Sequence, residues 1–220
     1  MKHALLLDLG HRGYREVWDL QRRTHAAVEQ GRSPDTWIAV EHSPVVTLGR
    51  QAKPGNVLLS AQALTERGIE VVEVERGGDV TYHGPGQLVV YPILKMERFR
   101  EVVPLVRSLE KAVIQCCARF GVKTEPWSEH AGVWAGDRCI CAVGLAVKRM
   151  VSMHGLALNV STALDYDRII NPCGFTDRGI TSLSVETGRS VSLDDAKHVL
   201  FEELSKEFDV SFSLERAAVA

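Results

Sequence analysis

Residues 132–160 read GVWAGDRCICAVGLAVKRMVSMHGLALNV, and this stretch decides which fold we expect. Two apolar runs, 132–135 and 139–147, are separated by Gly136-Asp137-Arg138, which predicts a β-hairpin. A third strand is predicted over 152–160. Strands joined by short turns pair antiparallel, so the stretch favours a mixed, largely antiparallel sheet over a doubly wound parallel one.

The rest of the chain alternates between strand-like and helix-like patterns. Ser192 and Asp195 predict the cap of a last helix, whose apolar face carries Ala196, Leu200, Leu204 and Phe208. No Pro/Ser-rich linker interrupts the chain, so we expect one α/β domain over 1–220, with helices flanking the sheet. The other expected elements are strands at 4–9, 36–41, 45–48, 69–76 and 88–94, helices at 14–30, 60–66 and 101–120, loops at 77–87 and 161–183, and a loose tail at 210–220.

Composition and charge exclude several classes of protein. Hydrophobic residues make up 45% of the 220 residues and charged residues 25%, which excludes a disordered chain and a disulfide scaffold. A general nucleic-acid binder is usually basic, so the formal net charge of −2 predicts no nucleic-acid partner. The apolar runs are shorter than the ~20 residues of a membrane helix, and the N-terminus has no signal-peptide pattern. Five cysteines in this composition indicate a reducing compartment, so we expect a cytoplasmic protein without a membrane partner.

The segment Arg76–Gln87, RGGDVTYHGPGQ, contains four glycines in twelve residues. Glycine costs conformational entropy, so such a segment is typical of backbone that approaches a ligand closely or presents N–H groups to an oxygen. It lacks the Gly-Lys-Ser/Thr ending of a P-loop and the third glycine of a dinucleotide fingerprint. It also holds the imidazole of His83. The alternative is an ordinary glycine-rich connection between two strands.

The cysteines fall into three groups. Cys173 stands in Asn171-Pro172-Cys173-Gly174, which has no hydrophobic periodicity, so it is a candidate nucleophile in a loop. The alternative for Cys173 is a small buried hydrophobe. Cys116 and Cys117 lie on or beside the apolar stripe of a helix, and we expect them in the core. Cys139 and Cys141 have Cys-x-Cys spacing without a second pair at zinc spacing, so we expect no metal site.

Residues 139–145 and 154–159 are rich in small and aliphatic side chains on adjacent expected strands. They are consistent with a narrow apolar slot, but taken alone they are more typical of ordinary sheet core. Which of the two they form has to be judged together with the neighbouring segments.

Together these segments resemble the lipoyl(octanoyl) transferases, also called octanoyl-carrier-protein:protein octanoyltransferases. The matching blocks appear in the family's order and span about 140 of the 220 residues. The resemblance implies the fold of the biotin/lipoate protein ligase catalytic domain, a mixed sheet flanked by helices. The blocks are Glu41–Arg50 (EHSPVVTLGR), Arg76–Gln87 with Tyr91-Pro92, Gly132-Val133-Trp134, Ala142-Val143-Gly144, His154–Asn159, Asn171–Gly174 and Thr181-Ser182-Leu183.

The resemblance also implies a reaction and its partners. An octanoyl (or lipoyl) group moves from acyl carrier protein to a lysine of a lipoyl domain, through an acyl thioester on Cys173 and without a cofactor. The implied acceptors are the lipoyl domains of 2-oxoacid dehydrogenases and the glycine cleavage H protein. The residues implied to surround the acyl chain and its carbonyl are Arg76, Gly77, Gly78, Asp79, Val80, Thr81, Tyr82, His83, Ala142, Val143, Gly144, Gly155, Leu156 and Ala157.

Elementary chemistry agrees with this reaction. A thioester carbonyl needs an attacking thiolate and N–H donors for the developing oxyanion, and glycine-rich backbone can supply such donors. Burying the seven carbons of an octanoyl tail at ~0.8 kcal/mol each contributes roughly 5 kcal/mol, which calls for an uncharged slot. The acceptor amine must lose a proton, so the site needs a base.

One position departs from the family pattern. Many relatives carry a lysine before the Ala/Val-Gly segment, which is said to lower the pKa of the cysteine, and Cys139 stands there in this chain. A free cysteine of pKa about 8.5 is only about 3% thiolate at pH 7, so another group must assist it. His83 and His154 are the candidate bases or ion-pair partners. Arg138 precedes the position by one residue and is expected on the opposite face of its strand.

Three explanations of Cys139 stay open. The chain is a natural variant that uses histidine, or Cys139 is an engineered replacement of the family lysine, or Cys139 and Cys173 form a disulfide that blocks the site.

Two other functions also stay open: an ATP-dependent lipoate or biotin ligase of the same fold, and a non-catalytic acyl or carrier-protein binding module. Because acyl carrier proteins are acidic, we predict that Lys148-Arg149 helps to receive the carrier; the alternative is a solvated surface pair.

Overall fold

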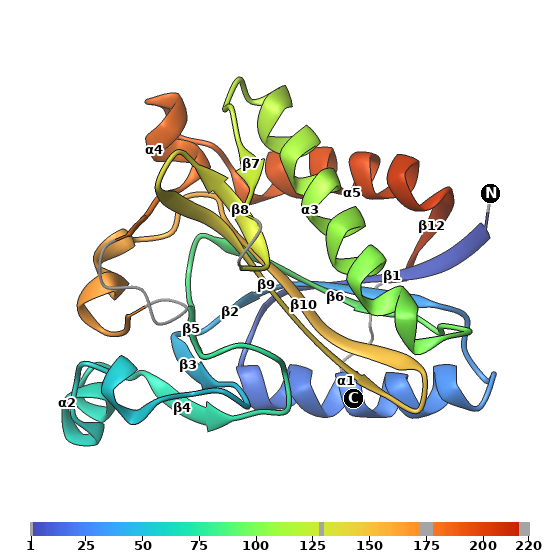
Figure 1. Cartoon of the computed structure of the whole chain (residues 1–220), viewed down its shortest axis with the longest axis horizontal. Helices are drawn as coiled ribbons and strands as arrows, with labels where there is room; N and C mark the ends of the chain where they lie inside the picture. The colour runs from blue at the N-terminus through green and yellow to red at the C-terminus, as the bar shows by residue number, and fades with distance from the viewer. Residues whose placement is uncertain (1, 128–129, 172–177, 216–220) are drawn as a thin grey trace.

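The computed structural model of the chain describes residues 2–127, 130–171 and 178–215, and a large mixed sheet lies at its centre (Figure 1). The strands of this sheet are β1 (Lys2–Arg12), β2 (Thr36–His42), β6 (Gln87–Ile93), β7 (Glu125–Pro126), β8 (Gly132–Ala135), β9 (Arg138–Lys148), β10 (Val151–Asn159), β11 (Gly179–Ile180) and β12 (Val210–Glu215). They follow the order β12-β1-β2-β6-β10-β9-β8-β7, with β11 beside β9.

Antiparallel pairing dominates this sheet. β9 pairs with β8 on one side and with β10 on the other, as the turns between them predict. β6 lies between β2 and β10 and is antiparallel to both. β1 is parallel to β2 and β12, and the short β11 is parallel to β9. The predicted mixed, largely antiparallel sheet is confirmed.

A smaller sheet carries the glycine-rich segment. Its central strand β3 (Val45–Leu48) is parallel to β4 (Glu70–Glu73) and antiparallel to β5 (Val80–His83). The prediction of a continuous loop over 77–87 was wrong, because β5 lies within it. Val80 and Tyr82 favour a strand, and pairing with β3 outweighs the neighbouring glycines. His83 is therefore held at the end of a strand.

The predicted helices form close to their expected positions. Ser60 and Ser192 cap their helices, because each hydroxyl oxygen accepts a hydrogen bond from a backbone N–H three residues later. The helices are α1 (Tyr14–Glu29), α2 (Ala61–Glu66), α3 (Val102–Arg119), α4 (Leu183–Thr187) and α5 (Leu193–Phe208), with single 3₁₀ turns η1 (Pro54–Asn56), η2 (Phe99–Glu101) and η3 (Leu164–Arg168). Among the described residues, no helix combines the length and the apolar character that a bilayer crossing requires.

The helices cover both faces of the large sheet (Figure 1). On one face α3 and α5 pack with β6 and β10 into a core that includes Leu109, Leu200 and Leu158, all fully buried. On the other face α1 packs Val17 against Ile38 and neighbouring sheet residues. Each such side chain contributes about 1.5–3 kcal/mol through removal from water. This packing fixes β9 and β10 in the middle layer.

The strand β12 corrects the expectation of a loose tail for residues 210–215, and residues 216–220 lie outside the described residues. Val210, Phe212 and Leu214 alternate with polar residues, which is the pattern of a half-buried strand. β12 pairs in parallel with β1, and the ring of Phe212 lies edge-on to Trp37, with centroids 5.6 Å apart. Pairing with β1 therefore orders residues 210–215 as a strand, although their sequence has no turn or cap residue to mark its ends.

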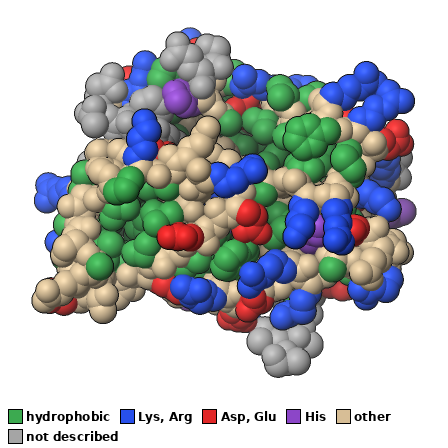
Figure 2. All heavy atoms as spheres, turned by 60° about the horizontal axis from the view of Figure 1, so that its bottom comes forward, with side chains coloured by type: hydrophobic (Ala, Val, Ile, Leu, Met, Phe, Trp, Pro, Cys, Tyr) green, Lys and Arg blue, Asp and Glu red, His purple; other side chains and the backbone are tan. Residues whose placement is uncertain are grey.

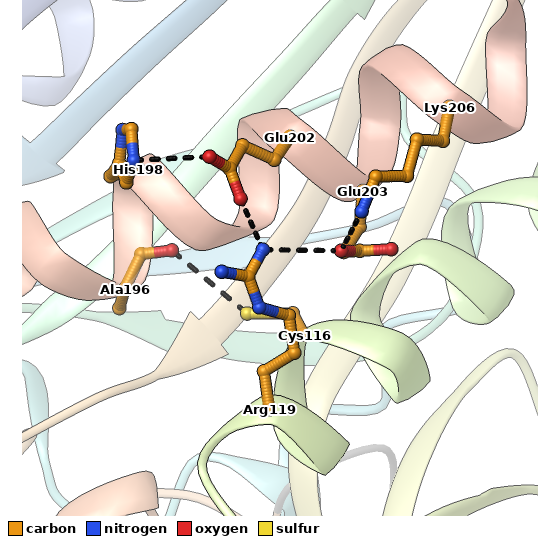
Figure 3. A network of polar contacts seen from close by, with 7 residues as sticks. All are labelled: Cys116, Arg119, Ala196, His198, Glu202, Glu203 and Lys206. Carbon is orange, nitrogen blue, oxygen red and sulfur yellow. Dashed lines mark hydrogen bonds and ion pairs between the residues drawn. The ribbon is translucent and has the colours of Figure 1, made fainter.

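A polar network joins α3 to α5 (Figure 3). The Arg119 guanidinium contacts the carboxylates of Glu202 and Glu203, and Lys206 Nζ lies 2.7 Å from Glu203 Oε1. Cys116 lies beneath this network, buried against α5, where its Sγ is 3.9 Å from the carbonyl oxygen of Ala196. Burial raises the pKa of the Cys116 thiol, and Cys117 is equally buried. The expectation that both cysteines belong to the core is confirmed.

Candidate active site

A cavity of about 700 Å³, here called the main cavity, is bounded by β9, β10, the segment after β4 and two helices. Its apolar wall includes Val143, Leu156, Val102 and Val106. Both candidate bases line it. So do all the residues predicted to surround an acyl chain except Tyr82: Arg76–Thr81, His83, Ala142–Gly144 and Gly155–Ala157.

Two of the predicted segments are cross-strand neighbours. Ala142–Gly144 of β9 pairs residue by residue with Gly155–Ala157 of β10. A Cβ on Gly155 would lie 2.1 Å from the carbonyl oxygen of Val90, so only glycine fits there. A Cβ on Gly144 would lie 3.3 Å from the carbonyl oxygen of Gly77, which lets the glycine-rich segment approach β9.

Two glycine N–H groups in this region are already occupied. The N–H of Gly77 donates to the carbonyl of Leu145 at 2.9 Å, and that of Gly86 donates to Glu41 Oε1 at 2.7 Å. Oxyanion donors would therefore have to come from other backbone N–H groups. The Gly77 bond instead ties the segment to β9 and shapes the cavity wall.

Arg76 is a buried cation that organises the same segment. Its guanidinium donates to the carbonyl and hydroxyl oxygens of Thr47 at 2.8 and 2.9 Å, and to the carbonyl of Gly77 at 2.9 Å. A buried charge is tolerated only with such hydrogen bonds. Asp79 is likewise engaged: its carboxylate accepts from the backbone N–H of Lys53 and from the Asn56 amide. These residues hold the loop in place around the cavity.

His83 is buried, and its hydrogen-bonding partner is a neutral amide. Its Nδ1 is 2.7 Å from Gln87 Oε1, and its ring stacks on Tyr14 with centroids 6.0 Å apart. Burial, with a further contribution from His42, lowers the pKa of His83 to about 3. His83 is therefore neutral at physiological pH.

His154 differs from His83 in its backbone conformation and in the residue that its ring faces. Its φ of +58° lies in the left-handed region inside β10, a conformation that costs about 1–3 kcal/mol for a residue with a side chain. Gln21 Oε1 from α1 accepts its backbone N–H at 2.9 Å. Its Nε2 lies 3.5 Å from the Glu75 carboxylate. Burial lowers the pKa of His154 and Glu75 opposes this, while the imidazole holds the pKa of Glu75 at about 2.

Sequence analysis missed several residues of the site. His42 Nε2 lies 2.9 Å from the Tyr91 hydroxyl, and burial lowers the pKa of His42 to about 4. His42 and Tyr91 stand in two of the matched blocks, which was the available signal. Tyr14 and Glu75 carried no signal, since their role depends on contacts distant in sequence.

Cys139 lies beside the main cavity. It is buried and lines a second, small cavity of about 20 Å³ together with Tyr82, Gln87 and Asn159. The two cavities share Val80, Thr81, Ala142 and Ala157. Arg138 is exposed and pairs with Glu186 at 2.9 Å, so it lies on the opposite face of β9, as predicted.

Cys173, with Pro172 and Gly174, lies outside the described residues. The chain on either side of this segment is anchored near the site. The N–H of Asn171 donates to the carbonyl of Asn56, and the N–H of Thr181 donates to the carbonyl of Cys139, both at 2.9 Å. Over 2–127, 130–171 and 178–215, no group of three or more His, Cys, Asp or Glu side chains is arranged to hold a metal ion.

Similar structures share this architecture. The structure of lipoate-protein ligase A bound with ATP has a TM-score of 0.77 at 16% identity, covering 99% of this chain and 89% of that one. A bi-partite lipoate protein ligase from Thermoplasma acidophilum has a TM-score of 0.78 at 16% identity, covering 99% and 88%. Biotin protein ligase from Aquifex aeolicus has a TM-score of 0.55 at 13% identity, covering 95% and 70%. The fold expected from the resemblance is confirmed.

Sequence relatives give the family. The family model of the lipoyl protein ligase A/B catalytic domain matches residues 13–205. An octanoyltransferase from Acidobacterium capsulatum is 46% identical over 196 residues, which cover 82% of this chain and 79% of that protein. An octanoyltransferase from Chloroflexus aggregans is 40% identical over 214 residues, covering 96% and 97%. The chain therefore belongs to the lipoyl protein ligase A/B catalytic-domain family, as a member of its octanoyltransferases, which are acyltransferases.

Proposed function

We propose that the chain transfers an octanoyl (or lipoyl) group from acyl carrier protein to a lysine of a lipoyl domain, through an acyl thioester on Cys173. The observation that carries this proposal is the main cavity, which combines an aliphatic wall with two buried imidazoles. The aliphatic wall suits an acyl tail, and an imidazole can take a proton from a thiol or an amine. The reaction requires no cofactor.

In this proposal the acyl chain lies along β9 and β10. Arg76–Thr81 and His83 would form one wall, and Ala142–Gly144 and Gly155–Ala157 would form the other. His83 and His154 are the catalytic candidates besides Cys173. Cys139 occupies the family's lysine position beside the small cavity, where an ammonium group would favour a neighbouring thiolate.

The proposed partners are octanoyl-acyl carrier protein as donor, and the lipoyl domains of 2-oxoacid dehydrogenases and the glycine cleavage H protein as acceptors. Lys148 and Arg149 lie at the turn between β9 and β10, and Arg149 Nη1 is 3.3 Å from Glu29 Oε1. Figure 2 shows basic side chains beside exposed hydrophobic ones on one face of the molecule. Charge reversal of Lys148 and Arg149 should raise the KM for acyl carrier protein; an unchanged KM would contradict a docking role.

The decisive experiment is intact-protein mass spectrometry after mixing the reduced protein with octanoyl-acyl carrier protein, with and without ATP. We expect one octanoyl adduct without ATP and none on Cys173→Ser. Acyl transfer that requires ATP would instead indicate a ligase. Binding of the carrier without any adduct would indicate a binding module, and Cys139→Lys would then show whether the lysine alone is lacking.

A further inference from the structure

A chain of side-chain amides connects the backbone at Thr181 to the ring of His83. Asn159 Nδ2 donates to the carbonyl of Thr181 at 3.0 Å, and Gln87 Nε2 donates to Asn159 Oδ1 at 2.9 Å. Gln87 Oε1 then lies 2.7 Å from His83 Nδ1. All three side chains are buried, so bulk water does not compete for these bonds.

Backbone carbonyls fix which group donates and which accepts in each of these hydrogen bonds. A carbonyl oxygen only accepts, so the nitrogen of Asn159 must face Thr181 and its oxygen must face Gln87. The Gln87 nitrogen must then face Asn159. Gln87 Nε2 also donates to the carbonyl of Tyr82 at 3.2 Å, which fixes the same orientation independently. Gln87 therefore presents its oxygen to His83.

An amide oxygen beside an imidazole nitrogen selects one tautomer of the ring. Gln87 Oε1 can only accept, so the neutral His83 ring carries its proton on Nδ1. The lone pair is then on Nε2, and His83 lines the main cavity. A ring free to exchange tautomers would carry this lone pair on Nε2 only part of the time.

We propose that Gln87 and Asn159 are positioning residues that hold His83 as the Nδ1–H tautomer, with Nε2 as the proton acceptor of the main cavity. This inference rests on the proposed acyl transfer. In each half-reaction Nε2 takes the proton of the attacking thiol or amine as the new bond to the acyl carbon forms. It returns that proton to the departing sulfur, of the carrier first and of the enzyme second, so no proton is gained or lost.

The groups around His83 suit an acceptor that stays neutral before each turnover. His42, Arg76 and His154 surround it, and a positive charge on His83 is unfavourable beside each of them. The group bonded to Nδ1 is a neutral amide rather than a carboxylate, so the ring gains no ion pair at this nitrogen when it is protonated. The acceptor lone pair is therefore available throughout the physiological pH range.

The tautomer can be measured directly in the wild-type protein by long-range ¹H–¹⁵N NMR of the histidine rings. We expect protonated Nδ1 and unprotonated Nε2 for His83. Gln87→Leu should shift His83 toward the other tautomer, while Gln62→Leu, the same change at an exposed glutamine, should leave it unchanged. An Nε2–H tautomer in the wild-type protein, or an unchanged ring in Gln87→Leu, would overturn the inference.

Kinetics test whether this tautomer matters. Gln87→Leu should lower kcat about tenfold or more with the KM for octanoyl-acyl carrier protein within about twofold. Gln87→Glu keeps an acceptor at Nδ1, so it should recover activity above neutral pH and move the acidic limb of the rate profile to higher pH. Loss through KM alone, or equal rates for both variants at every pH, would contradict the positioning role. Absence of an acyl adduct on the wild-type protein would reject the proposed function and leave the NMR assignment standing.

Discussion

The two buried imidazoles of the main cavity are held in opposite ways. His83 receives an amide oxygen and lies among neutral or positive groups, whereas His154 faces the Glu75 carboxylate. The backbone of His83 is an ordinary strand, whereas that of His154 is left-handed. One site therefore contains a histidine kept neutral and a histidine able to share a proton with a carboxylate. Such paired environments separate chemical roles between residues of the same type.

The largest expected effect comes from removing each ring in turn. His83→Ala should lower the single-turnover rate of octanoyl transfer about 100-fold or more, because general base catalysis contributes 10²–10⁴-fold. His154→Ala should lower it less, about tenfold, because its Nε2 is turned toward Glu75. Rapid-quench measurement of the acylated lipoyl domain checks both. A larger loss for His154→Ala would reverse the assignment of roles.

A second prediction introduces a cation at position 139, in the small cavity beside the main cavity. Cys139→Lys should raise the rate of acyl loading at pH 7, with a ceiling of about 30-fold, since an unassisted thiol is only about 3% thiolate there. The loss caused by His83→Ala should be smaller in this background, because the ammonium then supplies part of the activation. Burst-phase mass spectrometry measures the loading rate. A rate unaffected by Cys139→Lys, in a folded variant, would show that thiolate formation does not limit loading.

A third prediction concerns removal of the Glu75 carboxylate, which would make the surroundings of His154 more like those of His83. Without its anionic neighbour the pKa of His154 should fall, so Glu75→Gln should move the acidic limb of the kcat profile to lower pH and raise the rate near pH 5 about threefold to tenfold. The same limb should stay in place for Glu73→Gln, an exposed glutamate of β4. The measurement is kcat between pH 5 and 8. An acidic limb that does not move would show that His154 does not titrate in the reaction.

The contrast also shows how far sequence can predict the site. The matched blocks contain His83 and both strands of the apolar wall, because those residues occur in short segments of recognisable spacing. The bond from Gln87 to Asn159 joins positions 72 apart, and the bond from His154 to Gln21 joins positions 133 apart. Local pattern carries no information on such contacts, which are set by strand register and by the packing of α1.

Prediction of the fold has the same limit, because contacts between residues distant in sequence leave no local pattern. The hairpin of β8 and β9 is predictable because its turn residues and apolar runs are adjacent. β5 and β12 were missed because each becomes a strand only when a distant strand, β3 or β1, lies beside it. Pairing of this kind is tertiary, and short strands depend on it more than helices do.

The smallest expected effect is on stability, and it tests the comparison without any substrate. In the folded protein His83 has a pKa of about 3, below the ordinary value of 6.5, so between these values the unfolded chain binds a proton that the folded chain does not. The free energy of unfolding must then fall as pH falls, by about 1 kcal/mol per pH unit for this histidine between pH 6 and 5. His42, with a pKa of about 4, acts in the same direction.

Urea unfolding at several pH values between 6 and 5 measures this slope. His83→Gln should reduce it by about 1 kcal/mol per pH unit, because a glutamine binds no proton in either state. His154→Gln should reduce it less, because the Glu75 carboxylate offsets part of the effect of burial on His154. The same series on His198→Gln, at an exposed histidine of α5, is the control for the histidine-to-glutamine change itself. If His154→Gln flattened the slope as much as His83→Gln, the carboxylate would not distinguish the two rings, and the division of roles between them would lose its electrostatic basis.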